Sequence, residues 1–474
     1  MKKIIILLGL FMYTTTVAQT NFSEINKLID KGEFSEAQKL INIKIGEGDI
    51  DEDEIYNLRF KEDVLNRIRM DFSRDEEYVK NALKKYFPDL SEEQIKEWEE
   101  SNQLEMKIID GKKMYFRNAV PNLFRKNPTA NKIKQLKDGS DKSSLEKFLE
   151  SYLPDVVKAA QDSSKIFVSP KNLKITYSLS VKPDKVKDGE VVRAWLPFPR
   201  TDNKRISNLK LISVSNPEYI IAPDKYVHKS IYLEEKAQQG KPVVFSYSAE
   251  YTAFNEVNKI DLNIRPDYSA DNLLFKEYTS ERETHIIFTD AIKMLSKKIV
   301  GDEKNLLKKA KLIYLWIGKN IPWTSALEYS TIQNIPMYCL ENGRGDCGIK
   351  AMLFITLCRY NGIPAKWQSG WFIYPDNMNL HDWAEIYIPG KGWIPVDPDF
   401  NNQQIAEKTA SEFFFGSTDA YRLIINEDFS GAFYPAKTYP RSETVDFQRG
   451  EVEWKGGNLY FNDWNYDMEV EYID

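Results

Sequence analysis

The chain has 474 residues, of which 42% are apolar and 13% aromatic, and its formal net charge is −6 at pH 7. The aromatic content excludes a wholly disordered chain, and the lack of a Lys/Arg excess argues against a nucleic-acid partner. Three cysteines are too few for a disulfide framework, and three histidines leave little material for a multi-histidine metal site. We therefore expect no metal and no other cofactor. At roughly 150 residues per domain, the length corresponds to about three domains.

Residues 1–18 have the pattern of a secretory signal peptide. Lys2 and Lys3 form a basic start, residues 4–13 are almost wholly apolar, and small residues around Ala18 offer a cleavage site. The apolar run is shorter than the roughly 20 residues that span a bilayer, which disfavours the alternative of a retained anchor. We expect a periplasmic or secreted protein without a transmembrane segment after cleavage.

The next two regions differ in their hydrophobic periodicity. Residues 19–165 are polar, with apolar positions at helical spacing around Gly32, and predict a helical N-terminal domain. From about residue 173, apolar and polar residues alternate with a period of two, as in Ile175, Tyr177 and Leu179. This pattern predicts a β-sandwich-like domain over residues 166–260.

Helical spacing returns in residues 261–420, where a mixed α+β core is expected. Residues 421–474 end in β-hairpin material, with a turn at Gly456-Gly457. The predicted fold class is therefore multidomain α+β. It has a helical N-terminal region, a central β-sandwich-like domain, an α+β core and a C-terminal β segment.

One cysteine lies at the start of an apolar helix. Asp346 is a good N-cap for a helix whose residues 349–357 are apolar nearly all round, and Gly362 is a good C-terminal stop. Cys347 therefore falls in the first helical turn, where unpaired amides and the positive dipole end favour a thiolate. A packed core cysteine is the alternative.

A histidine and an acid lie on a predicted hairpin downstream. His381 opens the strand of residues 381–388, a Pro-Gly-Lys-Gly turn follows, and the returning strand carries Asp397. An antiparallel hairpin can bring these two side chains together at one end. A Cys–His–Asp triad requires such an arrangement, with the base beside the nucleophile and the carboxylate behind the base.

These motifs resemble the transglutaminase-like superfamily of papain-like cysteine enzymes over about residues 280–400. The matching residues are Gly345-Asp346-Cys347, Leu353-Phe354, Leu357-Cys358-Arg359, Gly362-Ile363-Pro364-Ala365, Ser369-Gly370-Trp371, His381-Asp382-Trp383-Ala384-Glu385 and Gly392-Trp393-Ile394-Pro395-Val396-Asp397-Pro398. The resemblance implies a papain-like core with Cys347 as nucleophile, His381 as general base and acid, and Asp397 as its orienting partner. Trp323 also resembles the position of a side-chain oxyanion donor in this family, with core packing as the alternative.

Two further tryptophans, Trp371 and Trp383, are candidates for lining a substrate cleft, with core packing as the alternative. The expected chemistry is acyl transfer through a thioester, most simply hydrolysis of amide bonds in a peptide or protein substrate. A protein-glutamine γ-glutamyltransferase that cross-links proteins and a non-catalytic binding scaffold are the alternatives.

Overall fold

The computed structural model describes residues 22–48, 50–140, 142–266, 268, 272–401, 405 and 408–473, so the predicted signal peptide lies outside the described residues. The chain divides into two compact units, Met1–Gly139 and Ser140–Asp474. Within the described ranges, no helix combines the length and the apolar character that crossing a bilayer requires.

The first unit is helical, with one small hairpin. Its helices are α2 (Phe34–Glu47), α3 (Glu52–Asp71), α4 (Glu76–Lys84), α5 (Glu92–Glu100), α6 (Ala119–Lys126) and α7 (Pro128–Asp138). The hairpin joins β1 (Met106–Ile109) and β2 (Lys112–Tyr115) through Asp110-Gly111, both with positive φ. The turn that precedes α2 packs against this hairpin at Gly32. A Cβ at this position would lie 2.2 Å from the carbonyl oxygen of Ile108.

The second unit begins with α8 (Ser144–Ser163) and a β-sandwich. One sheet has the order β12-β8-β3-β16, with β5 also paired to β8, and the other has the order β15-β14-β4-β7-β6. The strands are β3 (Phe167–Val181), β4 (Val191–Pro197), β5 (Ile206–Val214), β6 (Tyr219–Ile221), β7 (Ser230–Lys236), β8 (Val243–Val257), β12 (Ser417–Thr418), β14 (Glu451–Trp454), β15 (Gly457–Leu459) and β16 (Trp464–Ile473). Every second residue of β3 faces the core from Leu173 onward, which is the alternation seen in the sequence.

The C-terminal strands complete this sandwich. All of β16 pairs antiparallel with β3, and β14 pairs with both β4 and β15. Pairing of Trp454 with Gly457 places the hairpin turn at Lys455-Gly456, one residue earlier than the predicted Gly-Gly turn.

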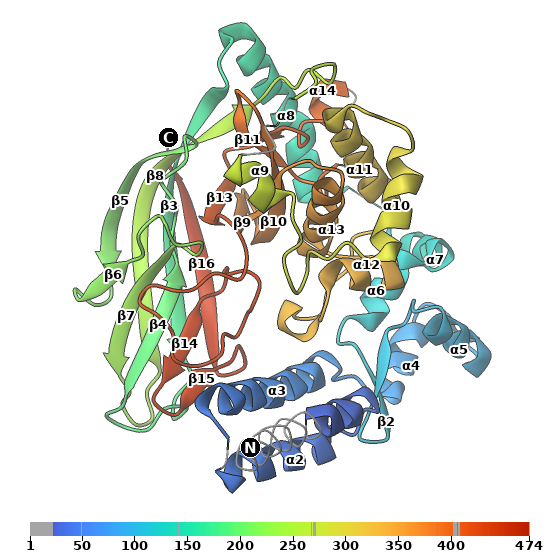
Figure 1. Cartoon of the computed structure of the whole chain (residues 1–474), viewed down its shortest axis with the longest axis vertical. Coiled ribbons are helices and arrows are strands. Elements are labelled where there is room, and N and C mark those ends of the chain that lie inside the picture. The colour runs from blue at the N-terminus through green and yellow to red at the C-terminus, as the bar shows by residue number, and fades with distance from the viewer. Residues whose placement is uncertain are drawn as a thin grey trace, which may run out of the picture. The chain divides into compact units, whose positions relative to one another are not determined.

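The remaining elements form the α+β core. Its helices are α9 (Leu273–Tyr278), α10 (Asp290–Val300), α11 (Leu306–Asn320), η1 (Tyr329–Thr331), α12 (Ile335–Asn342), α13 (Cys347–Tyr360) and α14 (Lys408–Ser411). The antiparallel sheet β11-β10-β9-β13 contains β9 (Ala365–Tyr374), β10 (Asn377–Ile388), β11 (Gly392–Val396) and β13 (Arg422–Asn426). Figure 1 shows this sheet between the sandwich and helices α10 to α13.

Helix α13 is the centre of the core. Its residues from Gly348 to Arg359 are all buried, as expected for a helix that is apolar on every side. It ends before Gly362, whose φ of 74° is the left-handed conformation of a helix stop. The predicted multidomain α+β fold class is confirmed.

Candidate active site

The first turn of α13 fixes the position of the cysteine. Asp346 is the N-cap, and its Oδ1 accepts a 3.0 Å hydrogen bond from the backbone N–H of Ile349. Cys347 is the first residue of the helix. Its backbone N–H therefore belongs to the unpaired amides that open a helix, and these amides can stabilise a developing oxyanion.

The sulfur of Cys347 lies against the strand that carries the histidine. Sγ is 3.4 Å from Oδ2 of Asp382, the residue after His381. Burial raises the pKa of the Cys347 thiol well above its ordinary value, and the charges of Asp382, Asp346 and Asp399 raise it further. The structure therefore favours a thiol over the thiolate expected from the helix dipole, because burial and, after it, the surrounding carboxyl groups oppose ionisation.

The hairpin of β10 and β11 brings His381 and Asp397 together, as its pattern predicts. Ala384 pairs with Val396, so the next residue, Asp397, reaches the open end of the hairpin. His381 Nε2 lies 2.7 Å from Asp397 Oδ2, and both side chains are buried. Phe400 packs edge-on against the His381 ring at 5.0 Å, which holds the imidazole in place.

Asp397 is held as a carboxylate. Burial opposes its ionisation, but His381 and Arg422 outweigh burial and hold the pKa of Asp397 at about 2. Arg422 Nη2 donates a 2.8 Å bond to Oδ2, and the backbone N–H groups of Asp399 and Phe400 donate to Oδ1. A stable carboxylate behind the imidazole fixes its tautomer and supports an imidazolium.

Sequence reasoning missed Arg422. This side chain is 1% exposed and also contacts Asp419 and the hydroxyl of Tyr374. In the sequence, Arg422 stands out only as a cation inside the apolar run of β13. That position does not indicate Asp397 as its partner.

The three candidate tryptophans occupy different places. Trp323 is 40% exposed, and its backbone forms a parallel bridge with Gly345, two residues before Cys347. Trp371 and Trp383 are each 1% exposed, so they do not line an open cleft in this structure. Their indole N–H groups bond to the carbonyl oxygen of Gln448 and to Oε1 of Gln368, and their rings fill the core.

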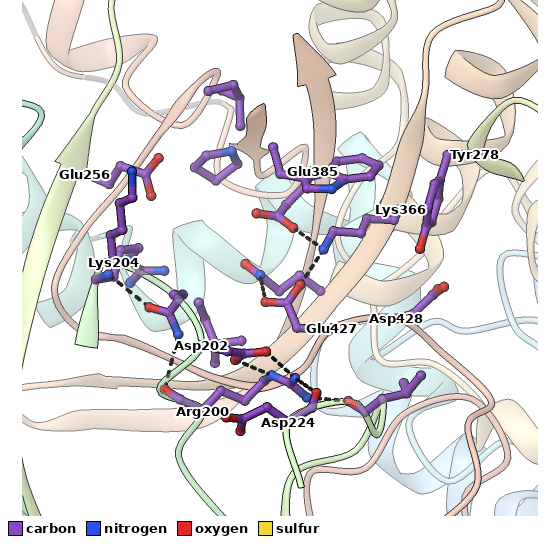
Figure 2. A pocket seen from close by; sticks show the side chains of 18 of the residues that line it. Arg200, Asp202, Lys204, Asp224, Glu256, Tyr278, Lys366, Glu385, Glu427 and Asp428 are labelled. Atoms are coloured by element: carbon purple, nitrogen blue, oxygen red, sulfur yellow. Dashed lines mark hydrogen bonds and ion pairs between the residues drawn. The ribbon is translucent and has the colours of Figure 1, made fainter. Parts of the chain in front are cut away.

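A large cavity lies elsewhere in the second unit. Its volume is about 1100 Å³, and its lining includes Arg200, Glu256, Lys366, Glu385 and Glu427, but not the candidate triad. Figure 2 shows Lys366 between Glu385 and Glu427, and its Nζ is 3.0 Å from Glu385 Oε2. Burial outweighs this cation and raises the pKa of Glu385 to about 7.

Comparison with known proteins identifies the core. A family model described as the transglutaminase-like superfamily matches residues 293–398. The uncharacterized protein YebA of Bacillus subtilis is 27% identical over 142 residues, which are 26% of this chain and 19% of that protein. An uncharacterized protein of Haemophilus influenzae is 28% identical over 291 residues, which are 51% of this chain and 75% of that protein. The match thus spans only about a fifth of the length of the Bacillus protein.

Two solved structures are also similar. A candidate cysteine protease from Cytophaga hutchinsonii has 18% sequence identity and a TM-score of 0.42, over 65% of this chain and 92% of that chain. The periplasmic domain of TgpA from Pseudomonas aeruginosa has 13% identity and a TM-score of 0.26, over 55% of this chain and 97% of that chain. From the family match and the motifs above, residues 293–398 of this chain are a domain of the transglutaminase-like superfamily.

Proposed function

We propose that this protein is an extracytoplasmic, cysteine-dependent acyl-transfer enzyme that hydrolyses amide bonds in a peptide or protein. The observation that carries the proposal is the buried pair of His381 and Asp397, whose side chains lie 2.7 Å apart at the open end of the β10–β11 hairpin. Asp382, the residue after His381, contacts the Cys347 sulfur. Such a pair supplies a base of fixed orientation, which a cysteine nucleophile requires.

The proposed reaction has two steps. In the first, the Cys347 thiolate attacks the amide carbonyl carbon and the C–N bond breaks, while His381 passes a proton to the leaving amine. In the second, water attacks the thioester carbon and passes a proton to His381, the C–S bond breaks, and the acid product leaves with the Cys347 thiolate restored. The backbone N–H of Cys347 and the indole of Trp323 are the proposed donors to the oxyanion.

A peptide that carries a thiol-reactive group tests the nucleophile. We expect it to label Cys347 but not Cys339 or Cys358, because both of the latter are fully buried. Cys347→Ala should abolish labelling, and Asp397→Asn should slow it by about 100-fold or more, since it destabilises the required tautomer and imidazolium. Equal labelling of all three cysteines would support the non-catalytic scaffold instead.

The products distinguish hydrolysis from cross-linking. Incubation with a mixture of peptides and a fluorescent primary amine should create new peptide termini if water resolves the thioester. Ammonia release with incorporation of the amine would support a protein-glutamine γ-glutamyltransferase.

A further inference from the structure

A buried carboxyl group contacts the proposed nucleophile. Asp382 is 2% exposed, and its Oδ2 lies 3.4 Å from the sulfur of Cys347 and 3.3 Å from the hydroxyl of Tyr329. Its Oδ1 accepts a 2.8 Å bond from the side-chain amide of Gln448. The sulfur is therefore next to a fixed acid as well as next to the strand of His381.

A glycine allows this contact. Gly348 follows Cys347 in the first turn of α13, and a Cβ there would lie 2.1 Å from the Tyr329 hydroxyl and 2.7 Å from Asp382 Oδ2. Any side chain at this position would push both groups away. The sequence of the helix start thus brings Asp382 onto the sulfur.

Two of the groups that face Asp382 are carboxyl groups, Asp346 and Asp446. Cys347 and its neighbour Asp346 face it from the start and the N-cap of α13, and Tyr329 faces it from η1. Gln448 and Asp446 face it from the segment before β14, and both hydrogen-bond to Asp382. Among the described residues, no Lys, Arg or His makes an ion pair with Asp382: His381 binds Asp397, Lys350 binds Asp399 and Arg449 binds Glu328. Arg441 and Arg449 act on Asp446 instead.

This environment favours the neutral form of the acid. Burial raises the pKa of Asp382 to about 8, and the charge of Asp346 contributes to the increase. The hydrogen bond between Asp382 and Asp446 lowers the pKa of Asp382 and raises that of Asp446, so it opposes the effect of burial on Asp382 without reversing it. At neutral pH, Asp382 is therefore largely a carboxylic acid that can donate a hydrogen bond.

We propose that Asp382 is a positioning residue that holds the Cys347 sulfur and governs its ionisation: the neutral acid donates to the thiolate, whereas the carboxylate keeps the proton on sulfur. This inference rests on the proposed function, in which Cys347 must become a thiolate. Asp382 keeps its own proton throughout the reaction, and the proton of the thiol goes to His381. Above about pH 8, two negative charges 3.4 Å apart would compete, so the thiolate forms less readily there.

The test is the rate at which iodoacetamide alkylates Cys347 between pH 5 and pH 10, measured by peptide mass spectrometry on the full chain. Asp382→Asn removes the charge and keeps a hydrogen-bond donor, so we expect the midpoint of the pH profile to fall by one unit or more. Asp467→Asn, on the exposed face of β16, is the matched control and should leave the midpoint unchanged. An unchanged or higher midpoint in Asp382→Asn would overturn the proposal.

Tyr329→Phe provides a second, milder variant in case Asp382→Asn does not fold. Loss of the hydroxyl donor favours the neutral form of Asp382, so alkylation at pH 8.5 should become at least about threefold faster. A slower or unchanged rate contradicts the proposal.

His381→Ala separates this inference from the proposed function. If its Cys347 profile matches that of the unmodified protein, the triad fails. The response to Asp382→Asn still reports on Asp382 alone, because alkylation needs no substrate.

Discussion

At the scale of single residues, the candidate site is organised by how each buried charge is compensated. Asp397 lies between the imidazole of His381 and the guanidinium of Arg422, and both contact its Oδ2. Asp382, fifteen residues earlier on the same hairpin, contacts no cation at ion-pair distance within the described part of the chain. Two aspartates of one hairpin therefore take different forms at neutral pH, the first a carboxylate and the second largely an acid.

Replacing Arg422 by Met should destabilise the protein. Removal of one partner from a buried ion pair leaves an uncompensated charge, which costs about 3–5 kcal/mol of unfolding free energy. Because the folded pKa of Asp397 is about 2, below its ordinary 3.8, its contribution to stability is present above pH 4 and is lost as the pH falls through 2. In Arg422→Met the pKa of Asp397 rises, so acid unfolding should begin at a higher pH.

Urea unfolding at pH 7 and an acid titration followed by circular dichroism measure these two effects. Arg422→Lys is the control, since it keeps the charge but loses the planar guanidinium. Its stability should lie between those of the unmodified protein and Arg422→Met. Equal stability of the Met and Lys variants would mean that Arg422 does not compensate Asp397.

The sequence predicted those parts of the site that lie in short, continuous motifs. Cys347 follows a helix cap, and His381 and Asp397 lie on one hairpin, so local patterns place each of them. Arg422, Gln448 and Asp446 contact the site from segments 25 or more residues away from Asp397, and no periodicity links them to it. Asp382 was within the motif, but its burial among acids depends on those distant segments.

At the scale of elements, the start of α13 combines two opposing effects. Asp346 caps the helix through Ile349, and such a cap contributes about 1 kcal/mol. Its carboxyl group is also buried, and burial raises its pKa to about 6 in spite of that hydrogen bond. The cap therefore stabilises the helix, while ionisation of the same group destabilises the folded protein.

Replacing Asp346 by Asn should increase stability at neutral pH. The folded pKa lies above the ordinary 3.8, so the native state binds the proton more tightly, and the stability it contributes is lost as the pH rises from 4 through 6. Asn keeps the capping oxygen without the charge, and each pKa unit corresponds to about 1.4 kcal/mol. We expect a gain of at least about 1 kcal/mol at pH 7.5 that shrinks at pH 5.

Urea unfolding at both pH values tests this expectation. Asp346→Ala removes the cap as well, and should be about 1 kcal/mol less stable than Asp346→Asn at either pH. A gain in stability in Asp346→Asn that does not depend on pH would show that burial does not raise the pKa of this carboxyl group.

At the scale of the whole molecule, the sandwich and the core sheet share one hydrophobic cluster. Tyr177 of β3 stacks on Trp371 of β9 with ring centroids 5.1 Å apart, and the C-terminal strands β14 and β16 close the sandwich sheets. Periodicity predicts each of these regions separately. It does not reveal that they pack together, because strand pairing between β3 and β16 joins residues almost 300 positions apart.

Residues 140–474 should therefore fold without the first unit. Both large hydrophobic clusters lie entirely within this segment, and α8 begins with its own capping box formed by Ser143 and Glu146. We expect one cooperative thermal transition for this fragment, and the same pH profile of Cys347 alkylation as in the full chain. A shorter fragment, residues 140–463, lacks β16 and exposes the edge of β3, so it should lose the cooperative transition. The contrary result would be that residues 140–474 bind hydrophobic dyes and melt without a cooperative transition, whereas the full chain melts cooperatively. In that case the second unit depends on the first for its stability.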